Sequence, residues 1–261
     1  MSKIKSTSAL KLKMISLLAS NIGTLIILLL WWGIAQMQLI NPLLLPTPQE
    51  TLVTLWVSLW QDLPQDFFLT LYRSLYAFVI AAVMGVPVGI ILGSNEQIYY
   101  SCEFLIDFFR STPATAMFPL FLIIFGIDDF SKIAVAAFAA WLIVFFNVAY
   151  GVMSTRKTRI LAARVIGAPR WRIFFDVVFF ETLPQTFIGL RTAISLTLVV
   201  IIVAEMFIGS TNGMGQRIID AQQTFDLKQM YASIIATGIM GYSLNQVFLV
   251  IEKRFVHWKG K

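Results

Sequence analysis

Histidine, cysteine and charge are all scarce in this sequence. Its 261 residues include one cysteine, Cys102, and one histidine, His257. A chain so composed has no internal disulfide framework, and it lacks the side chains for a cysteine or histidine metal centre or a catalytic triad. Charged residues make up 13% of the chain, about half the share that a soluble domain carries. The sequence therefore predicts neither a soluble enzyme nor a metal-binding protein.

A phosphate-binding loop is missing as well. No stretch fits the pattern G-x-x-x-x-G-K-[ST], in which backbone amides and a lysine hold the phosphates of a nucleotide. We therefore expect no ATP hydrolysis by that route and no cofactor in this chain. Any transport driven by ATP would need a nucleotide site on another subunit.

Long apolar runs take the place of charge. Hydrophobic residues make up 58% of the chain, and about 20 apolar residues in a row are enough for a helix to cross a bilayer. Runs of this kind stand at residues 14–39, 67–92, 98–127, 130–152, 186–208 and 230–251. They predict an all-α integral membrane protein with about six transmembrane helices.

The third run has a different character from the others. Its first part carries Glu103, Asp107 and Arg110, and Pro113 interrupts it before a short apolar stretch. An amphipathic approach, a break and a short membrane helix are expected there. A short amphipathic helix is also expected at residues 50–60, where leucines recur at helical spacing.

Two parts of the chain follow from these runs. Residues 1–66 hold an N-terminal tail, the first transmembrane helix and an external amphipathic segment. Residues 67–261 form the core, with five transmembrane helices and a long loop at 153–184.

Lysine and arginine gather in the N-terminal tail, in the loop after the fourth run and in the C-terminal tail. With six spans, these three segments lie on one side of the membrane, and the opposite loops are mostly acidic. The positive-inside rule then places both termini and the long loop in the cytoplasm. The net charge of +6 therefore reflects topology and does not indicate nucleic-acid binding.

The most informative stretch is residues 158–184, TRILAARVIGAPRWRIFFDVVFFETLP. Residues 161–166 predict a short helix, Gly167 can take the positive φ that ends a helix at little cost, and Pro169 suits the start of the next helix. In that second helix one apolar face is expected from Trp171, Phe174, Phe175 and Val178. Two interpretations remain open: a docking surface for a soluble partner, or an amphipathic hairpin whose arginines bind lipid phosphates.

A resemblance to a known family adds to this pattern. The spacing Ala162-Ala163-x-x-x-Gly167, followed by nine residues and Val177, resembles the motif E-A-A-x-x-x-G-x(9)-I-x-L-P of permease subunits of binding-protein-dependent ABC importers. The segments LLPTP, RSTPATAMFPLFLIIFGI, GAPRWRIFFDVV, LPQTFIGLRTA and AEMFIGS resemble the nitrate, sulfonate, taurine and bicarbonate branch, and the likeness covers residues 71–258. Leu161 replaces the Glu of the motif and Phe180 its Pro, whereas Pro184 is kept.

The resemblance implies that the loop forms a coupling helix, which rests in a groove of an ATPase subunit. It places at or near this contact Leu161, Ala162, Ala163, Gly167, Ala168, Arg170 and Trp171. It also implies ATPase partners that bind ATP and Mg²⁺, an external substrate-binding protein and a second permease copy, as a homodimer. The location would be the bacterial inner membrane, and the solute would be nitrate, bicarbonate, a sulfonate or taurine.

Three polar residues within the apolar runs are candidates for the pathway or for bracing helices. Glu205 lies in the fifth run, where an ionisable group is costly, and bracing is favoured over lining the pathway. Arg191 and Asn147 are expected to brace neighbouring helices. An ion-coupled secondary transporter or a channel-type protein is the alternative function. A carrier is expected to show paired membrane carboxylates, and in the sequence Glu205 stands alone.

Overall fold

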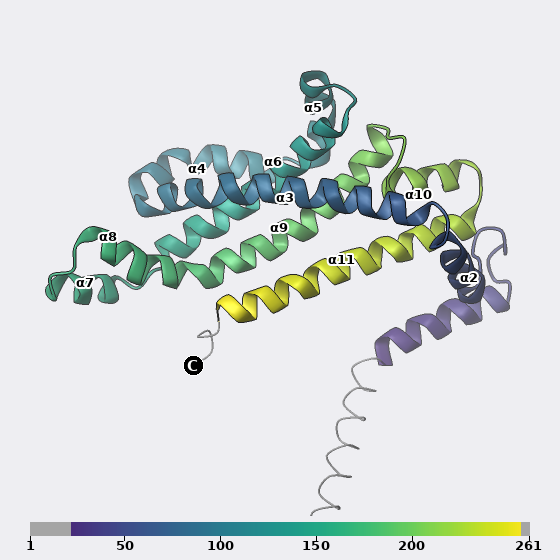
Figure 1. The fold of residues 1–261 in the computed structure, drawn as a ribbon, viewed down its shortest axis with the longest axis horizontal. Coiled ribbons are helices and arrows are strands. Elements are labelled where there is room, and N and C mark those ends of the chain that lie inside the picture. Colours follow the sequence, from purple (N-terminus) through teal and green to yellow (C-terminus); the bar gives the residue numbers. More distant parts are fainter. Residues whose placement is uncertain (1–21, 257–261) are drawn as a thin grey trace, which may run out of the picture.

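The computed structural model describes residues 22–256, which form helices and connecting turns without a strand (Figure 1). In chain order they are a helix at Ile22–Gln36, α2 (Pro48–Ser58), α3 (Leu63–Ser94), α4 (Glu96–Ser111), η1 (Ala114–Met117), α5 (Phe118–Phe125), α6 (Asp129–Met153), α7 (Lys157–Val165), α8 (Arg170–Arg172), η2 (Ile173–Phe179), α9 (Phe180–Phe207), α10 (Met214–Gln223) and α11 (Leu227–Phe255). The predicted all-α fold is confirmed.

Four helical segments are long and apolar enough to cross a membrane: α3, α6, the continuous segment Arg170–Phe207 and α11. A fifth span arises if α4 and the following η1–α5 segment count as one, with a bend of 90° between them. The first predicted run starts at residue 14, and its residues before Ile22 lie outside the described part of the chain. The total of six spans therefore stays a prediction.

The broken third span follows from its sequence as expected. The side chain of Asn95 caps α4 by accepting hydrogen bonds from the amides of Gln97 and Ile98. The helix ends at Ser111, two residues before Pro113. After the break, α5 runs to Phe125 and ends at Gly126, which has a φ of +79°.

A short helix is also found where one is expected between the first two runs, at Pro48–Ser58. Thr47 and Glu50 form a reciprocal capping box at the start of α2. The Glu50 carboxylate also pairs with the Lys228 ammonium at 2.7 Å, which joins α2 to α11. The hydrogen bond from Lys228, followed by those from Thr47, lowers the pKa of Glu50 from 4.5 to about 2.

Helices α3 and α6 pack most closely of all. Gly85, Gly89 and Gly93 form a ladder at every fourth position on the face of α3 that meets α6. A Cβ added to Gly89 would lie 2.5 Å from the carbonyl oxygen of Phe145 and 2.6 Å from the Cβ of Val148. In a bilayer, such close approach gives helices the van der Waals contact that holds them together.

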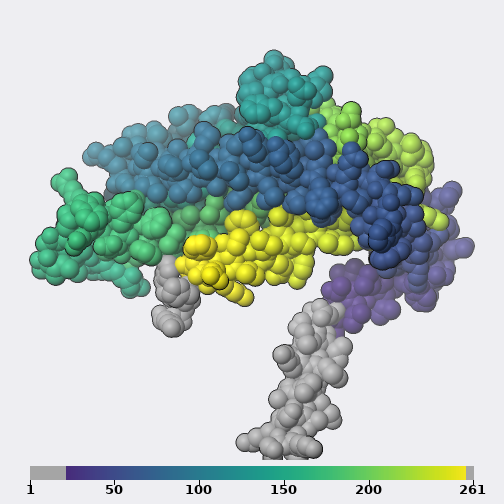
Figure 2. Space-filling view, viewed as in Figure 1, coloured from purple at the N-terminus to yellow at the C-terminus, as the bar shows by residue number. Residues whose placement is uncertain are grey.

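The long helices carry the remaining elements to two ends of the bundle (Figure 1). The segment α7–α8 lies at one end, and α2 and α10 lie at the other. Figure 2 shows α7 and α8 (green) as a protruding lobe at their end. We refer to these as the α7–α8 end and the α10 end.

The prediction of one apolar face on the helix after Pro169 is wrong. The chain from Ile173 to Phe179 is a π-helix, whose wider turn does not keep the spacing of an α-helix. Ile173 is buried and Phe174 and Val178 are half-buried, whereas Trp171 and Phe175 are 61% and 55% exposed. The four predicted residues are therefore divided between a packed side and an exposed side.

Candidate functional site

The turn at Gly167 ends α7 by a defined motif. Gly167 has a φ of +80°, the left-handed region that glycine enters without a Cβ clash. Its amide donates to the carbonyl of Arg164, and the amide of Ala168 donates to that of Ala163, both at 3.0 Å. These two bonds form a Schellman motif, which satisfies the last carbonyl groups of the helix. Pro169 then precedes α8 as its N-cap, one position before the first helical turn.

The residues around this turn present an unpartnered apolar surface. Leu161 is 56% exposed, Val165 87%, Ile166 83% and Trp171 61%. Ala162, Gly167 and Arg170 are exposed too, whereas Ala163 and Ala168 are half-buried. This surface lies at the α7–α8 end of the bundle (Figure 1). Exposed apolar patches of this kind mark interaction sites.

The base of the lobe is held to the bundle by Glu181. Its carboxylate accepts a hydrogen bond from the amide of Arg156 at 2.9 Å and pairs with the guanidinium of Arg159. The side chain of Ile173 is buried at the same junction. The contacts of Glu181 and the buried side chain of Ile173 therefore hold the lobe against the bundle, while its outer surface stays exposed.

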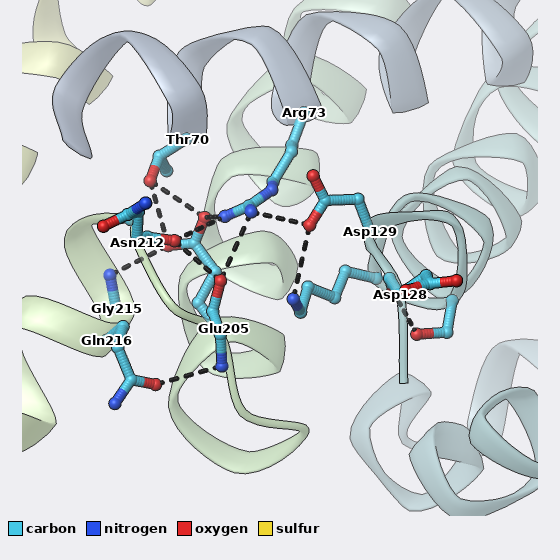
Figure 3. Close-up of polar contacts among 12 residues, drawn as sticks. Thr70, Arg73, Asp128, Asp129, Glu205, Asn212, Gly215 and Gln216 are labelled. Carbon is cyan, nitrogen blue, oxygen red and sulfur yellow. Dashed lines mark hydrogen bonds and ion pairs between the residues drawn. The ribbon is translucent and has the colours of Figure 1, made fainter. Parts of the chain in front are cut away.

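At the α10 end, Glu205 is the centre of a buried polar network (Figure 3). Its side chain is 0% exposed, and its carboxylate accepts hydrogen bonds from the Thr70 hydroxyl and the Gly215 amide, both at 2.9 Å. The Arg73 guanidinium pairs with it at 2.5 Å. The carboxylate thus has partners from α3 and from the turn that follows α9.

Arg73 links Glu205 to a second carboxylate (Figure 3). Its side chain is 3% exposed, and its Nη2 lies 2.6 Å from Oδ1 of Asp129, the first residue of α6. It also donates to the Ser210 hydroxyl at 3.2 Å and to the Asn212 carbonyl at 2.9 Å. One guanidinium therefore ties together α3, α6, α9 and the loop between α9 and α10. We name Thr70, Arg73, Asp129 and Glu205 the Glu205 network.

Asp66 extends this arrangement along α3. It accepts a hydrogen bond from the Gly213 amide at 2.8 Å and pairs with Arg217 of α10 at 3.1 Å. The Met214 amide donates to the Thr70 hydroxyl at 2.8 Å. The start of α10 is therefore pinned to the start of α3 by backbone and side-chain bonds together.

Glu205 stands alone in the sequence of its span, but in the structure it has a cationic partner, Arg73. Arg73 lies 132 positions away in the sequence, and sequence reasoning did not single it out. A signal was available, because Arg73 is an ionisable residue inside an apolar run, like Glu205. Two such residues of opposite sign at the same end of two spans predict a pair. The second carboxylate, Asp129, is bridged to Glu205 by a cation and is not a neighbour that shares a proton.

Arg191 and Asn147 lie apart from both regions. Arg191 of α9 pairs with Glu252 of α11 at 3.5 Å. The side-chain oxygen of Asn147 on α6 accepts a hydrogen bond from Gln185 on α9 at 3.0 Å, and its nitrogen donates to the Ile143 carbonyl. Each joins two long helices, which supports bracing. Within residues 22–256, no group of three His, Cys, Asp or Glu side chains could hold a metal ion.

Comparison with known proteins places the chain in a family. The profile of the family described as "binding-protein-dependent transport system inner membrane component" matches residues 85–259. The taurine transport system permease protein TauC of Escherichia coli (strain K12) is 31% identical over 92% of this chain and 90% of its own length. The nitrate import permease protein NrtB of Synechocystis is 29% identical over 64% of this chain and 60% of its own.

The putative aliphatic sulfonates transport permease protein SsuC of Bacillus subtilis is 26% identical over 66% of this chain and 62% of its own length. Among solved structures, the inward-facing MetNI methionine ABC transporter superposes with a TM-score of 0.66 at 19% identity, over 76% of this chain and 97% of that one. Permeases of this family are multi-pass inner-membrane subunits that lack ATPase activity and act with an ATPase and a binding protein. The chain belongs to the family of binding-protein-dependent transport system inner membrane components and is a permease subunit of an ABC importer.

Proposed function

We propose that this permease imports a small organic sulfonate or a similar oxyanion, with taurine as the first candidate. The observation that carries the proposal is the 31% identity to a taurine permease across 92% of this chain. The sulfonate and nitrate permeases among its relatives carry solutes of the same kind, small and anionic or zwitterionic. Nitrate and bicarbonate are therefore the next candidates.

The contact with the ATPase is proposed at the lobe of α7 and α8. Its apolar residues Leu161, Val165 and Ile166 are more than half exposed although they lie outside the candidate spans, and Trp171, at the start of the span Arg170–Phe207, is 61% exposed. An ion-coupled carrier or a channel needs no such surface, because it has no soluble subunit to bind. The exposed lobe thus favours the importer over the alternative.

A homodimer is proposed for the membrane part. In the most apolar window of α11, 11% of the residues are buried within the chain. The exposed side of that helix includes Tyr242, Ser243 and Gln246. Lipid cannot satisfy an amide such as that of Gln246, whereas a second permease copy or a water-filled pathway between two copies can.

The orientation proposed from the basic loops puts the lobe and both termini in the cytoplasm. Thr158 and Asp220 are both exposed and lie at opposite ends of the bundle. In a background without Cys102, a cysteine at position 220 should react with a membrane-impermeant thiol reagent added to intact cells. A cysteine at position 158 should react only after the cells are permeabilised. The reverse pattern would overturn the orientation and the place of the ATPase contact.

The test of the function is uptake by intact cells that produce the permease with its ATPase and binding protein. Labelled taurine should accumulate, and unlabelled alkanesulfonates should compete more strongly than nitrate or bicarbonate. Purification in a mild detergent should recover the ATPase with the permease. Competition by nitrate alone would move the proposal to that solute, and an absence of bound ATPase would overturn the importer assignment.

A further inference from the structure

A cavity of about 460 Å³ lies on the inner side of the α7–α8 lobe. Its walls come from the last turn of α3, the last turn of α6, α7 and the segment α8–η2. Apolar side chains form much of the lining, among them Val152, Ile160 and Phe174. Three cations also line it, namely Lys157, Arg164 and Arg170. The cavity therefore joins an apolar wall to a basic rim.

Two of the three cations lack a partner in the described chain. Lys157 pairs with Glu96 at 3.5 Å, and Glu96 is the one acidic residue in the lining. Within residues 22–256, the guanidinium groups of Arg164 and Arg170 form neither an ion pair nor a side-chain hydrogen bond. Of the neighbouring arginines, Arg159 pairs with Glu181 and Arg172 stacks over Trp171 at 5.3 Å. Two guanidinium groups without an ion-pair partner among the described residues therefore line this cavity.

The cavity and the proposed ATPase surface use different faces of α7. Lys157, Ile160 and Arg164 follow one another at i, i+3 and i+7, so they share one face of the helix, and they line the cavity. Leu161 and Val165 are displaced around the helix, are exposed and do not line the cavity. One short helix can therefore contact two different molecules at once.

The level of the cavity indicates which molecule fills it. Its walls include Gly93 and Ser94 at the end of α3 and Met153 at the end of α6. These residues stand at the ends of two candidate membrane spans, so we expect them near the level of the lipid headgroups. Basic pockets between membrane helices at this level bind anionic headgroups, and arginine matches the geometry of a phosphate.

We propose that this cavity binds an anionic phospholipid, with the headgroup phosphate between Arg164 and Arg170 and the apolar wall against the glycerol and the upper acyl chains. The bound lipid then contacts both the lobe and the ends of the spans α3 and α6. Arg170 serves this lipid site, although the family resemblance alone would place it at the ATPase contact. The site is independent of which solute is carried.

The test uses the importer complex with its ATPase, stripped of lipid in detergent. Phosphatidylglycerol or phosphatidylcholine with the same acyl chains is added, and binding is followed by native mass spectrometry. Phosphatidylglycerol should bind more tightly to the wild-type complex. Arg164→Gln and Arg170→Gln should each weaken its binding about fivefold, and phosphatidylcholine binding should not change.

Arg172→Gln is the matched control. It removes the same charge from the same lobe, but Arg172 stacks on Trp171 and does not line the cavity. Phosphatidylglycerol binding should stay at the wild-type value in this variant. A loss equal to that in Arg170→Gln would mean that only the overall charge of the lobe matters, which would overturn the site.

A further variant keeps Arg164 and Arg170 and changes a residue in the wall of the cavity. Ser94 is exposed at the end of α3, so Ser94→Glu should fold and bring a carboxylate that competes for the guanidinium groups. Phosphatidylglycerol binding should again fall severalfold. Unchanged binding in all three cavity variants would overturn the proposal. Displacement of the lipid by millimolar inorganic phosphate would also overturn it. A third contrary result would be arginine variants that lose the ATPase while the lipid stays bound.

Discussion

The charged side chains at the two ends of the bundle differ in burial and in pairing. At the α10 end, Arg73 is 3% exposed and Glu205 is 0% exposed, and each has its partner within the chain. At the α7–α8 end, Arg164 and Arg170 are exposed and have no ion-pair partner among the described residues. A buried charge is tolerated only with a partner, whereas an exposed charge is stable in water and available for binding. The buried charges at the α10 end are therefore neutralised within one chain, and the exposed arginines at the α7–α8 end are available to other molecules.

The comparison predicts the largest effect for Arg73→Met. The change would leave Glu205 buried without its cation, and breaking a buried pair in this way costs about 3–5 kcal/mol. The free energy of unfolding should fall by that amount in detergent, measured by thermal or denaturant unfolding of the full chain.

Arg191→Met is the control for this experiment. It removes an arginine from a membrane span as well, but the side chain is 37% exposed and lies 3.5 Å from Glu252. Its loss should cost less than about 1 kcal/mol. Equal destabilisation by the two variants would contradict the special place of the Glu205 network.

At the other end, Gly167→Trp should spare the fold and break the assembly. A residue with a Cβ at a φ of +80° costs about 1–2 kcal/mol, and the large side chain would also obstruct a partner surface. We expect at least a tenfold loss of the ATPase that co-purifies with inserted permease, and Gly167→Ala should be milder.

Gly126→Trp is closely matched to that variant. Gly126 has a φ of +79°, and neither glycine has an atom within 4 Å of the position that a Cβ would take. A side chain at Gly126 is strained as well, because its φ of +79° and ψ of −174° lie in a region that is essentially limited to glycine, but Gly126 lies at the end of α5 and outside the lobe. ATPase retention should stay normal in this variant, and a similar loss in both would remove the coupling assignment of Gly167.

The variant Glu205→Gln tests whether Glu205 has a role beyond holding helices together at the α10 end. The amide presents a donor to a site filled with the donors of Thr70, Arg73 and Gly215, which should cost about 1–3 kcal/mol of stability. If Glu205 only braces the helices, uptake per inserted permease should remain largely intact. Uptake that is lost while protein levels stay normal would assign it to the solute pathway instead.

The smallest effect is expected at Glu50, which is paired but open to solvent. Its folded pKa of about 2 lies below the ordinary 4.5, so its contribution to stability is present above pH 4.5 and is lost as the pH falls toward 2. Because the side chain is 43% exposed, the contribution is below about 1 kcal/mol. Glu50→Gln should lower the melting temperature slightly at pH 7, and the difference should shrink at pH 3. A difference that grows toward low pH would contradict the assignment.

Sequence reasoning succeeded where the cause of the structure is local. The turn after α7 depends on Gly167 and Pro169, which lie within it, and the break in the third span depends on Pro113. It failed where the cause is distant. The partner of Glu205 is 132 residues away on another helix, and only a comparison of the two apolar runs, not the residues around Glu205, could have indicated the pair. The π-helix at Ile173–Phe179 was missed as well, because π-helices are rare and the apolar spacing was read with the period of an α-helix.

The glycine ladder of α3 has a mechanical consequence. Three residues separate the end of α6 from the start of α7, so a force on the lobe acts on α6 almost directly. Because Gly89 leaves no free space against Phe145 and Val148, α3 cannot lag behind α6, and close-packed interiors transmit strain with little compression. We therefore expect α3 and α6 to move together when the lobe is displaced, which would connect the lobe to the part of α3 that carries Arg73.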